Sequence, residues 1–180
     1  MKTGNDRLFC TLVSSEGGIK TGRITCYMYI FQLAGFELDF RYKVANYGVK
    51  SHDFNQYLNE AINQGVLSAN RGTINVTIDI EEAYLKYPLG ITDLNLIENI
   101  KSFLDELDDD DLTFLCLTDI VVSDMKKKVS VNRMAEERLN IESVLQGLSP
   151  VFSKENFDSS LKVIRYIKEG QYEKLVRKCE

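Results

Sequence analysis

The sequence predicts a mostly α protein of the α+β class: a winged-helix-like N-terminal module with a β-hairpin wing, followed by a helical C-terminal part. Up to residue 80, the apolar spacing changes in the order helix, helix, strand, helix, hairpin. Beyond it, helical spacing dominates. The 180 residues, 44% apolar and 27% charged, suit a globular chain. We expect residues 1–88 to form the module and 89–180 a helical extension packed on it.

Two helices open the predicted module. The first covers residues 6–15 and ends at Gly17-Gly18. The second covers Thr21–Ala34 and ends at Gly35. Its apolar residues recur at i, i+3, i+4 and i+7: Ile24, Tyr27, Met28 and Phe31. These residues are expected to face a core.

A strand is predicted over Phe36–Val44, because apolar and charged residues alternate there. Residues 46–50 are expected to form a loop. Ser51 is a candidate N-cap for a third helix that ends at Gly65. Its apolar residues again have helical spacing: Phe54, Tyr57, Leu58 and Ala61.

A hairpin and a run of helices complete the predicted fold. Residues 66–69 and 73–80 flank Asn70-Arg71-Gly72, which predicts the hairpin. The predicted C-terminal helices cover residues 94–107, 112–125, 131–148 and 157–164, and Gly170 separates a short charged end piece. Asp111 is expected to be the N-cap of the helix over 112–125.

Charge is unevenly distributed along the chain. Residues 1–80 carry 8 basic and 7 acidic side chains, residues 81–125 carry 2 and 12, and residues 126–180 carry 12 and 8. DNA binding depends on neutralising phosphates, so the almost neutral module is poorly equipped for it. A winged-helix DNA-binding transcription regulator is kept as the alternative function. Its candidate contacts are Lys20, Arg23 and Arg71.

The acidic run Asp108–Asp111 suggests a cation site, since carboxylates bind Mg²⁺ and Ca²⁺. Four consecutive residues seldom converge on one ion, and the run lacks the spacing of an EF-hand loop. We therefore predict a solvated helix junction, with a surface for a basic partner as the second interpretation, and no metal site.

No catalytic group is predicted. His52 is the only histidine, and no nucleophile accompanies it at a recognisable spacing. Cys26 and Cys116 lie in apolar surroundings and are expected to be core residues, as is Cys10. Residues 17–22 lack the spacing of a P-loop, so Thr21 is expected to cap the second helix. We expect no enzyme and no cofactor.

The cysteines and the chain ends indicate a compartment. The four cysteines contain no Cys-x-x-Cys pair and no dense disulfide framework. The first residues are polar, and the apolar runs are far shorter than a membrane span. We expect reduced thiols in a cytoplasmic protein without a membrane partner.

Several short motifs between Ile24 and Gly65, and just beyond, resemble those of one family. They are Tyr29-Ile30-Phe31-Gln32, Phe40-Arg41-Tyr42, Tyr47-Gly48-Val49-Lys50-Ser51, Tyr57-Leu58 and Gly65-Val66-Leu67. Over the first half of the chain they resemble the Panacea and YwgA-like group of small bacterial proteins, although Val49 replaces a proline. The resemblance implies an antitoxin-like partner or an accessory subunit of defence operons, including those with ABC or SMC-like ATPases, and implies no catalytic residues.

The sequence thus predicts a non-catalytic protein–protein interaction module. It would be an accessory or regulatory, antitoxin-like subunit of a bacterial anti-phage or plasmid defence complex, with an effector or an ATPase subunit as partner. Exposed aromatic and acidic side chains are the candidate contacts. These are Tyr42, Tyr47, Tyr57, Asp108, Asp109 and Asp110. The sequence equally allows these tyrosines to be core residues.

Overall fold

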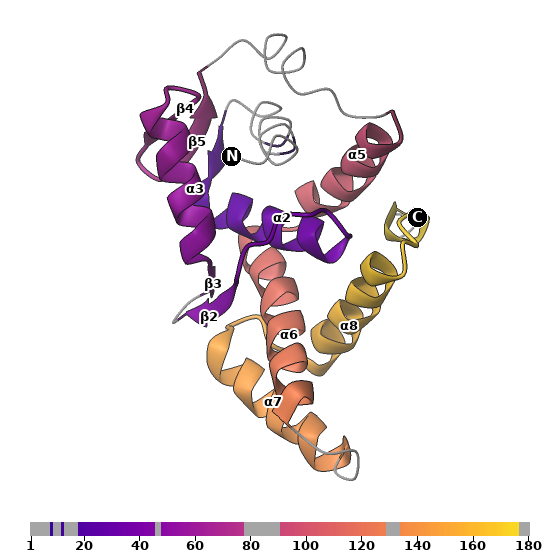
Figure 1. Cartoon of the computed structure of the whole chain (residues 1–180). Coiled ribbons are helices and arrows are strands. Elements are labelled where there is room, and N and C mark those ends of the chain that lie inside the picture. The colour runs from indigo at the N-terminus through magenta and orange to yellow at the C-terminus, as the bar shows by residue number, and fades with distance from the viewer. Residues whose placement is uncertain are drawn as a thin grey trace.

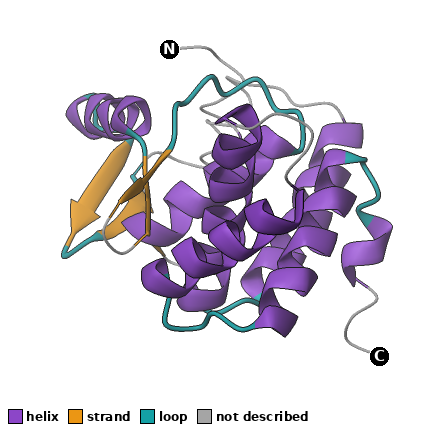
Figure 2. Cartoon of the chain, turned by 90° about the horizontal axis from the view of Figure 1, so that it is seen from below, coloured by secondary structure: helices purple, strands orange, loops and turns teal. Residues whose placement is uncertain are grey.

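The computed structural model describes Leu8, Leu12 and residues 18–45, 48–77, 91–128 and 134–176. These residues form a mostly helical molecule with a small antiparallel sheet, in agreement with the predicted α+β class (Figure 1). Figure 2 shows the strands gathered at one side of the molecule, with helices making up the rest.

The larger sheet has three short antiparallel strands in the order β1-β5-β4. Their bounds are β1 Ile19–Lys20, β4 Leu67–Asn70 and β5 Thr73–Val76. The predicted hairpin is confirmed, with Asn70 opposite Thr73. Arg71 and Gly72 have φ of 50° and 83°, the two left-handed residues that a two-residue type I′ turn needs.

Helix α2, Thr21–Leu33, follows β1 and is buried on every side. All eight residues from Ile24 to Phe31 are buried, so the helix is covered well beyond the predicted stripe. It ends as predicted, with Gly35 at φ 97°. Thr21 does not cap it: its backbone N–H and its hydroxyl both donate to the carbonyl oxygen of Gly72 at 2.9 Å, which ties the helix start to the hairpin turn.

The predicted strand over Phe36–Val44 is wrong for most of its length. Only β2, Lys43–Ala45, is a strand, and it pairs with β3, Gly48–Lys50, where the sequence predicts a loop. Burial does alternate along the segment, with Leu38 and Phe40 buried between exposed charged residues. The chain turns at Asp39, which has φ 54°, so the segment cannot stay extended.

A side chain takes the place of a neighbouring strand beside this segment. The Gln32 Nε2 donates to the carbonyl oxygen of Phe40, and its Oε1 accepts from the Phe40 N–H, both at 3.0 Å. The backbone N–H of Arg41 donates to Asp53 Oδ2 at 3.1 Å. Side chains thereby form the hydrogen bonds that a neighbouring strand would otherwise provide to these backbone groups.

Helix α3, His52–Asn63, begins at the predicted cap. The buried Ser51 Oγ accepts from the N–H of Phe54 at 3.1 Å. The predicted apolar residues of α3 are its buried ones. Gly65, at φ 70°, follows the helix and leads into β4.

The C-terminal part consists of helices in the predicted order. They are α5 Ile91–Asp105, α6 Asp109–Lys128, α7 Met134–Leu148, α8 Lys154–Lys168 and the short α9 Glu173–Val176. Helix α6 lies at the centre and contacts α2, α7, α8, β2 and β3 (Figure 1). Buried residues of the module and of the extension, Phe31 and Phe54 with Ile97 and Ile164, belong to one core cluster, so the two parts share a core.

The N-cap predicted at Asp111 is wrong by three residues. Asp108 Oδ1 accepts from the backbone N–H groups of Asp110 and Asp111, at 2.9 and 2.8 Å. The exposed Asp109, Asp110 and Asp111 fill the first turn of α6, where the helix dipole favours acids. Asp108 is therefore the residue that caps the helix.

Some predicted features fall outside the described residues. Of the first predicted helix, the structure describes Leu8 and Leu12, which are helical and buried. Cys10, Tyr47 and residues 78–80 of the predicted hairpin are not among the described residues.

Candidate functional site

The face of α2 that packs on α6 carries three residues with polar contacts, spaced three positions apart. Arg23, Cys26 and Tyr29 meet α6 near Asp109, Cys116 and Asp119 respectively. None of the three belongs to the apolar stripe that the sequence predicts for α2. This contact between α2 and α6 thus contains an ion pair, a buried cysteine pair and a tyrosine–carboxylate hydrogen bond.

The two candidate nucleic-acid contacts on β1 and α2 are held by the acidic run. Lys20 Nζ lies 2.6 Å from Asp109 Oδ2, and Arg23 Nη1 lies 3.1 Å from Asp109 Oδ1. Arg23 also donates to the carbonyl oxygen of Leu104 at 2.8 Å and to the Tyr27 hydroxyl at 3.1 Å. In a role in DNA binding, both cations would have to act while paired with Asp109 or exchange it for phosphate.

The same contacts occupy Asp109, a candidate partner contact. The hydrogen bond from Lys20 holds the pKa of Asp109 below its usual range, and Arg23 adds to this effect against the opposing effect of burial. The Tyr27 hydroxyl and Lys101 Nζ both donate to the neighbouring Asp105. The acidic surface is thus partly neutralised from within the chain.

Asp108 and Asp110 remain exposed, beside Asp111. Partial burial raises the pKa of Asp111, and the charges of Asp108 and Asp110 raise it further. A cation brought to this point would relieve that repulsion.

Two of the three candidate aromatic contacts pack within the molecule. Tyr57 is buried, with its ring against Phe40 and Phe54. The Tyr42 ring meets Tyr29 edge to face, with centroids 4.9 Å apart. Both tyrosines pack against the core, so little of their surface is available to a partner. Tyr47 lies outside the described residues.

Arg71, the third candidate nucleic-acid contact, is exposed at the hairpin turn. The exposed face of α3 near it is rich in side-chain amides. Its residues are His52, Asn55, Gln56, Asn59, Glu60, Asn63 and Gln64. This face therefore offers many hydrogen-bonding groups but no lysine or arginine.

An open pocket of about 340 Å³ lies between α5, α6 and α8, and we call it the α5–α6–α8 groove. Half of its lining residues are apolar, and we call these its floor: Phe103, Leu107, Phe114, Leu115 and Val163. The polar Asn156 and Ser160 of α8 also line it. Glu106 and Asp111 stand at its rim, with Ser159 on α8. An apolar floor beside acids suits an apolar group flanked by positive charge.

Asp119 forms a buried ion pair that the sequence reasoning missed. Its carboxylate is only 4% exposed and accepts from the Tyr29 hydroxyl at 2.7 Å and from Lys168 Nζ at 2.6 Å. Burial raises the pKa of Tyr29, and the Asp119 charge raises it further. The available signal was a single acid inside the apolar run 112–122. The pair joins α2, α6 and α8.

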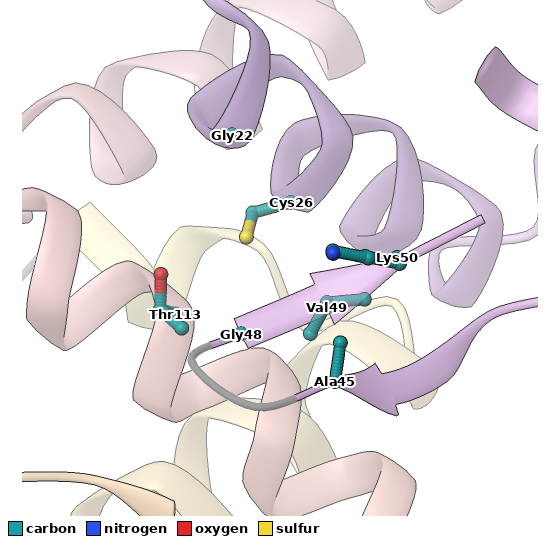
Figure 3. Close-up of a pocket in the computed structure, with 7 residues that line it drawn as sticks. All are labelled: Gly22, Cys26, Ala45, Gly48, Val49, Lys50 and Thr113. Atoms are coloured by element: carbon teal, nitrogen blue, oxygen red, sulfur yellow. The ribbon is translucent and has the colours of Figure 1, made fainter.

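A second pocket, of about 390 Å³, lies between the start of α2, the β2–β3 pair and α6. Figure 3 shows Cys26 pointing from α2 into the space bounded by Thr113 of α6 and by β3. Gly22 and Gly48 form parts of the wall that carry no side chain. We call this the Cys26 pocket.

Comparison with known proteins adds no assignment. No family model, curated protein or solved structure matches the chain.

The described residues include no group of three or more His, Cys, Asp or Glu side chains placed to hold a metal ion. His52 is exposed at the first turn of α3, beside the ion pair between Arg41 and Asp53. No helix in the described part of the chain is long and apolar enough to cross a membrane.

Proposed function

We propose that the chain is a non-catalytic protein–protein interaction module, an accessory or regulatory, antitoxin-like subunit of a bacterial defence complex. The observation that carries the proposal is the α5–α6–α8 groove, in which an apolar floor lies beside acids. The defence setting, with an effector or an ABC or SMC-like ATPase subunit as partner, follows from the resemblance to the Panacea and YwgA-like group.

In this proposal the N-terminal module, which we call the front of the molecule, is a winged helix that serves as a scaffold. Its support is topological: a short strand precedes α2, the hairpin follows α3, and the sheet order is β1-β5-β4. The β2–β3 pair would then be an insertion between the second and third helices. In this arrangement the hairpin strand β5 pairs with β1, although the two strands are more than 50 residues apart in the chain. The buried residues of α2 and α3 belong to the same core cluster as those of α5 and α8.

The proposed occupant of the groove is a segment of a partner protein with an apolar anchor next to lysine or arginine. The anchor would cover Phe103 and Val163, and its positive charge would lie near Asp111. Asp108 and Asp110 already repel the Asp111 carboxylate, so a partner cation at this point would be attracted by all three. Desolvated apolar anchors carry most of the energy at such interfaces.

Affinity purification of the tagged full chain from its native host, at low and moderate salt, tests the proposal when it is repeated with groove variants. Ser159→Phe would fill the groove from α8, and Asp111→Lys would reverse a rim charge. Glu98→Lys makes a matched charge change at an exposed site of α5 outside the groove. Circular dichroism would establish that each variant is folded.

The proposal requires a stoichiometric protein that is retained by wild type and Glu98→Lys and lost by Ser159→Phe and Asp111→Lys. Higher salt should weaken its binding, because the rim contribution is electrostatic. Absence of a stoichiometric partner, or a partner that both groove variants retain, would overturn the proposal.

The alternative function is duplex DNA binding by α3 and the hairpin, and the amide-rich exposed face of α3 favours it. Asparagine and glutamine side chains can form paired hydrogen bonds with adenine in the major groove. Because Asp109 holds Lys20 and Arg23, Asp109→Asn should strengthen duplex binding if these cations contact phosphates, and Arg71→Ala should weaken it. Absence of binding at low salt would exclude this function.

A further inference from the structure

The Cys26 pocket brings one thiol to the surface of a cavity and a second thiol directly behind it. Cys26 lines the pocket from α2 and is 3% exposed. Cys116 of α6 is fully buried, and its Sγ lies 3.8 Å from the carbonyl oxygen of Cys26. The two helices are thus close enough at this point for the sulfurs to interact.

The surroundings make the two thiols unequal. A hydrogen bond from Cys116 lowers the pKa of Cys26, and one from Thr113 adds to this, although burial opposes both. Burial raises the pKa of Cys116, which is not among the residues that line the pocket. The thiol that lines the pocket is therefore also the one that loses its proton more readily.

Tyr42 supplies a further polar group next to the pair. Its hydroxyl is buried without a hydrogen-bond partner among the described residues. Burial raises its pKa, and the nearby Cys116 and Cys26 raise it further. An unpartnered buried hydroxyl is costly, so a new acceptor near the two sulfurs would stabilise it.

We propose that Cys26 is an oxidation site for a small hydroperoxide that enters the pocket, and that Cys116 is its resolving cysteine. The Cys26 sulfur attacks one peroxide oxygen: an S–O bond forms, the O–O bond breaks, and the alcohol or water that leaves takes the Cys26 proton. The Cys116 sulfur then attacks the Cys26 sulfur: an S–S bond forms, the S–O bond breaks, and water leaves with the Cys116 proton. Two electrons pass from the thiols to the peroxide.

This inference is independent of the proposed partner. The disulfide would join α2 of the front to α6 of the C-terminal part, across 90 positions of the chain. It would therefore fasten the winged-helix-like front to the central helix. Neither the α5–α6–α8 groove nor the exposed face of α3 contributes a residue to the Cys26 pocket.

Treatment of the reduced full chain with hydrogen peroxide, followed by alkylation, trypsin digestion and mass spectrometry, tests the inference. Trypsin separates the cysteines, because residues 24–41 contain only Cys26 and residues 102–126 contain only Cys116. The expected product is these two peptides joined, with two hydrogens fewer than the free pair. In Cys116→Ser, Cys26 should stop at sulfenic acid, which dimedone traps.

Gly22→Leu tests whether the pocket is the route. A Cβ at Gly22 meets no atom within 4 Å, so the new side chain would extend into open space at the pocket wall. Gly147→Leu is the matched control, because Gly147 is also helical, has no atom within 4 Å of such a Cβ, and lies on α7. We expect Cys26 oxidation to become several-fold slower in Gly22→Leu and to be unchanged in Gly147→Leu.

Three results would overturn the inference. The first is a Cys26 that stays reduced while the same chain in denaturant is oxidised. The second is a disulfide that joins Cys26 to Cys10 or Cys179 instead of Cys116. The third is an equal rate in Gly22→Leu and Gly147→Leu, with both variants folded by circular dichroism.

Discussion

Asp109 and Asp119 of helix α6 each form an ion pair with a lysine, and the surroundings of the two carboxylates differ. Asp109, at its start, is 46% exposed and meets Lys20, whose side chain is 73% exposed. Asp119, in its middle, is 4% exposed and meets Tyr29 and Lys168. The two Lys–Asp distances are equal at 2.6 Å, so the pairs differ in burial and not in the distance between their charged atoms.

Burial decides what each pair contributes to folding. An exposed pair adds little to the stability of the fold, because water stabilises the two separate charges almost as well as their contact does. A buried carboxylate has lost its water and depends on every remaining partner, so removal of one partner is costly even where the intact pair adds little net stability. Variants at the two sites should therefore show how much of the stability of each pair depends on the contact distance and how much on burial of the carboxylate.

The largest effect is expected for Lys168→Met. The substitution leaves the buried Asp119 charge with only the Tyr29 hydroxyl as a described hydrogen-bond partner. We expect the free energy of unfolding to fall by about 3 kcal/mol, the lower end for a broken buried pair because Lys168 is itself half-exposed. Urea unfolding of wild type and variant measures the difference.

The control for this prediction removes all the charged and polar partners together. The triple variant Tyr29→Phe, Asp119→Leu, Lys168→Met has no buried charge at this place. It should recover most of the lost stability. A triple variant as unstable as Lys168→Met would mean that packing around Lys168, and not the stranded charge, causes the loss.

The next effect extends the comparison from a buried charge to buried neutral groups. Gln32→Leu leaves the N–H and the carbonyl of the buried Phe40 without the partners that they have now. We expect a loss of about 2 kcal/mol in the free energy of unfolding, since each unsatisfied buried group costs about 1 kcal/mol or more. Gln56→Leu, at an exposed amide bonded to Glu60, should change little and is the matched control. Equal losses in the two variants would contradict the argument.

The Gln32 contact also explains where sequence reasoning failed on the fold. Periodicity predicted α3, the hairpin and α8, because each buries a face that repeats with its own period. It also predicted α2, although that helix is buried well beyond the predicted stripe. The same reasoning predicted the burial pattern of residues 36–44 but assigned a strand. Alternating burial needs only an extended chain over a core, whereas a strand needs a backbone partner. Here the side chain of Gln32, eight residues earlier in the chain, supplies that bonding.

Sequence reasoning on the site failed for a related reason. Lys20, Arg23 and Asp109 were each judged by charge, and their pairing across more than 80 positions could not be anticipated from local patterns. Cys26 and Cys116 were correctly expected to be buried, but nothing in the linear spacing places them against one another. Arg23, Cys26 and Tyr29 do share one face of α2, which a search for a second, polar stripe on an apolar helix would have found.

A smaller, pH-dependent effect is expected at the exposed end. Lys20 and Arg23 lower the pKa of Asp109 in the folded chain, so the unfolded chain binds its proton more readily. The stabilisation is therefore complete above the ordinary Asp pKa of 3.8 and disappears as pH falls through the lower folded value. Asp109→Asn should lose about 1 kcal/mol at neutral pH, and its melting temperature should approach that of wild type on acidification. A difference that stays constant between neutral and acidic pH would contradict this origin.

The smallest effect is expected for Lys20→Met, which makes at the exposed pair the same substitution as Lys168→Met at the buried one. Asp109 keeps Arg23 as a partner and remains 46% exposed, so no charge is stranded. The loss should be about 0.5 kcal/mol or less, and it should shrink further in high salt. The loss in Lys168→Met should survive the same salt, because ions do not reach a carboxylate that is 4% exposed. If both Lys→Met variants lost similar stability with similar salt dependence, the 2.6 Å contact itself, and not the burial of the carboxylate, would determine the strength of these pairs.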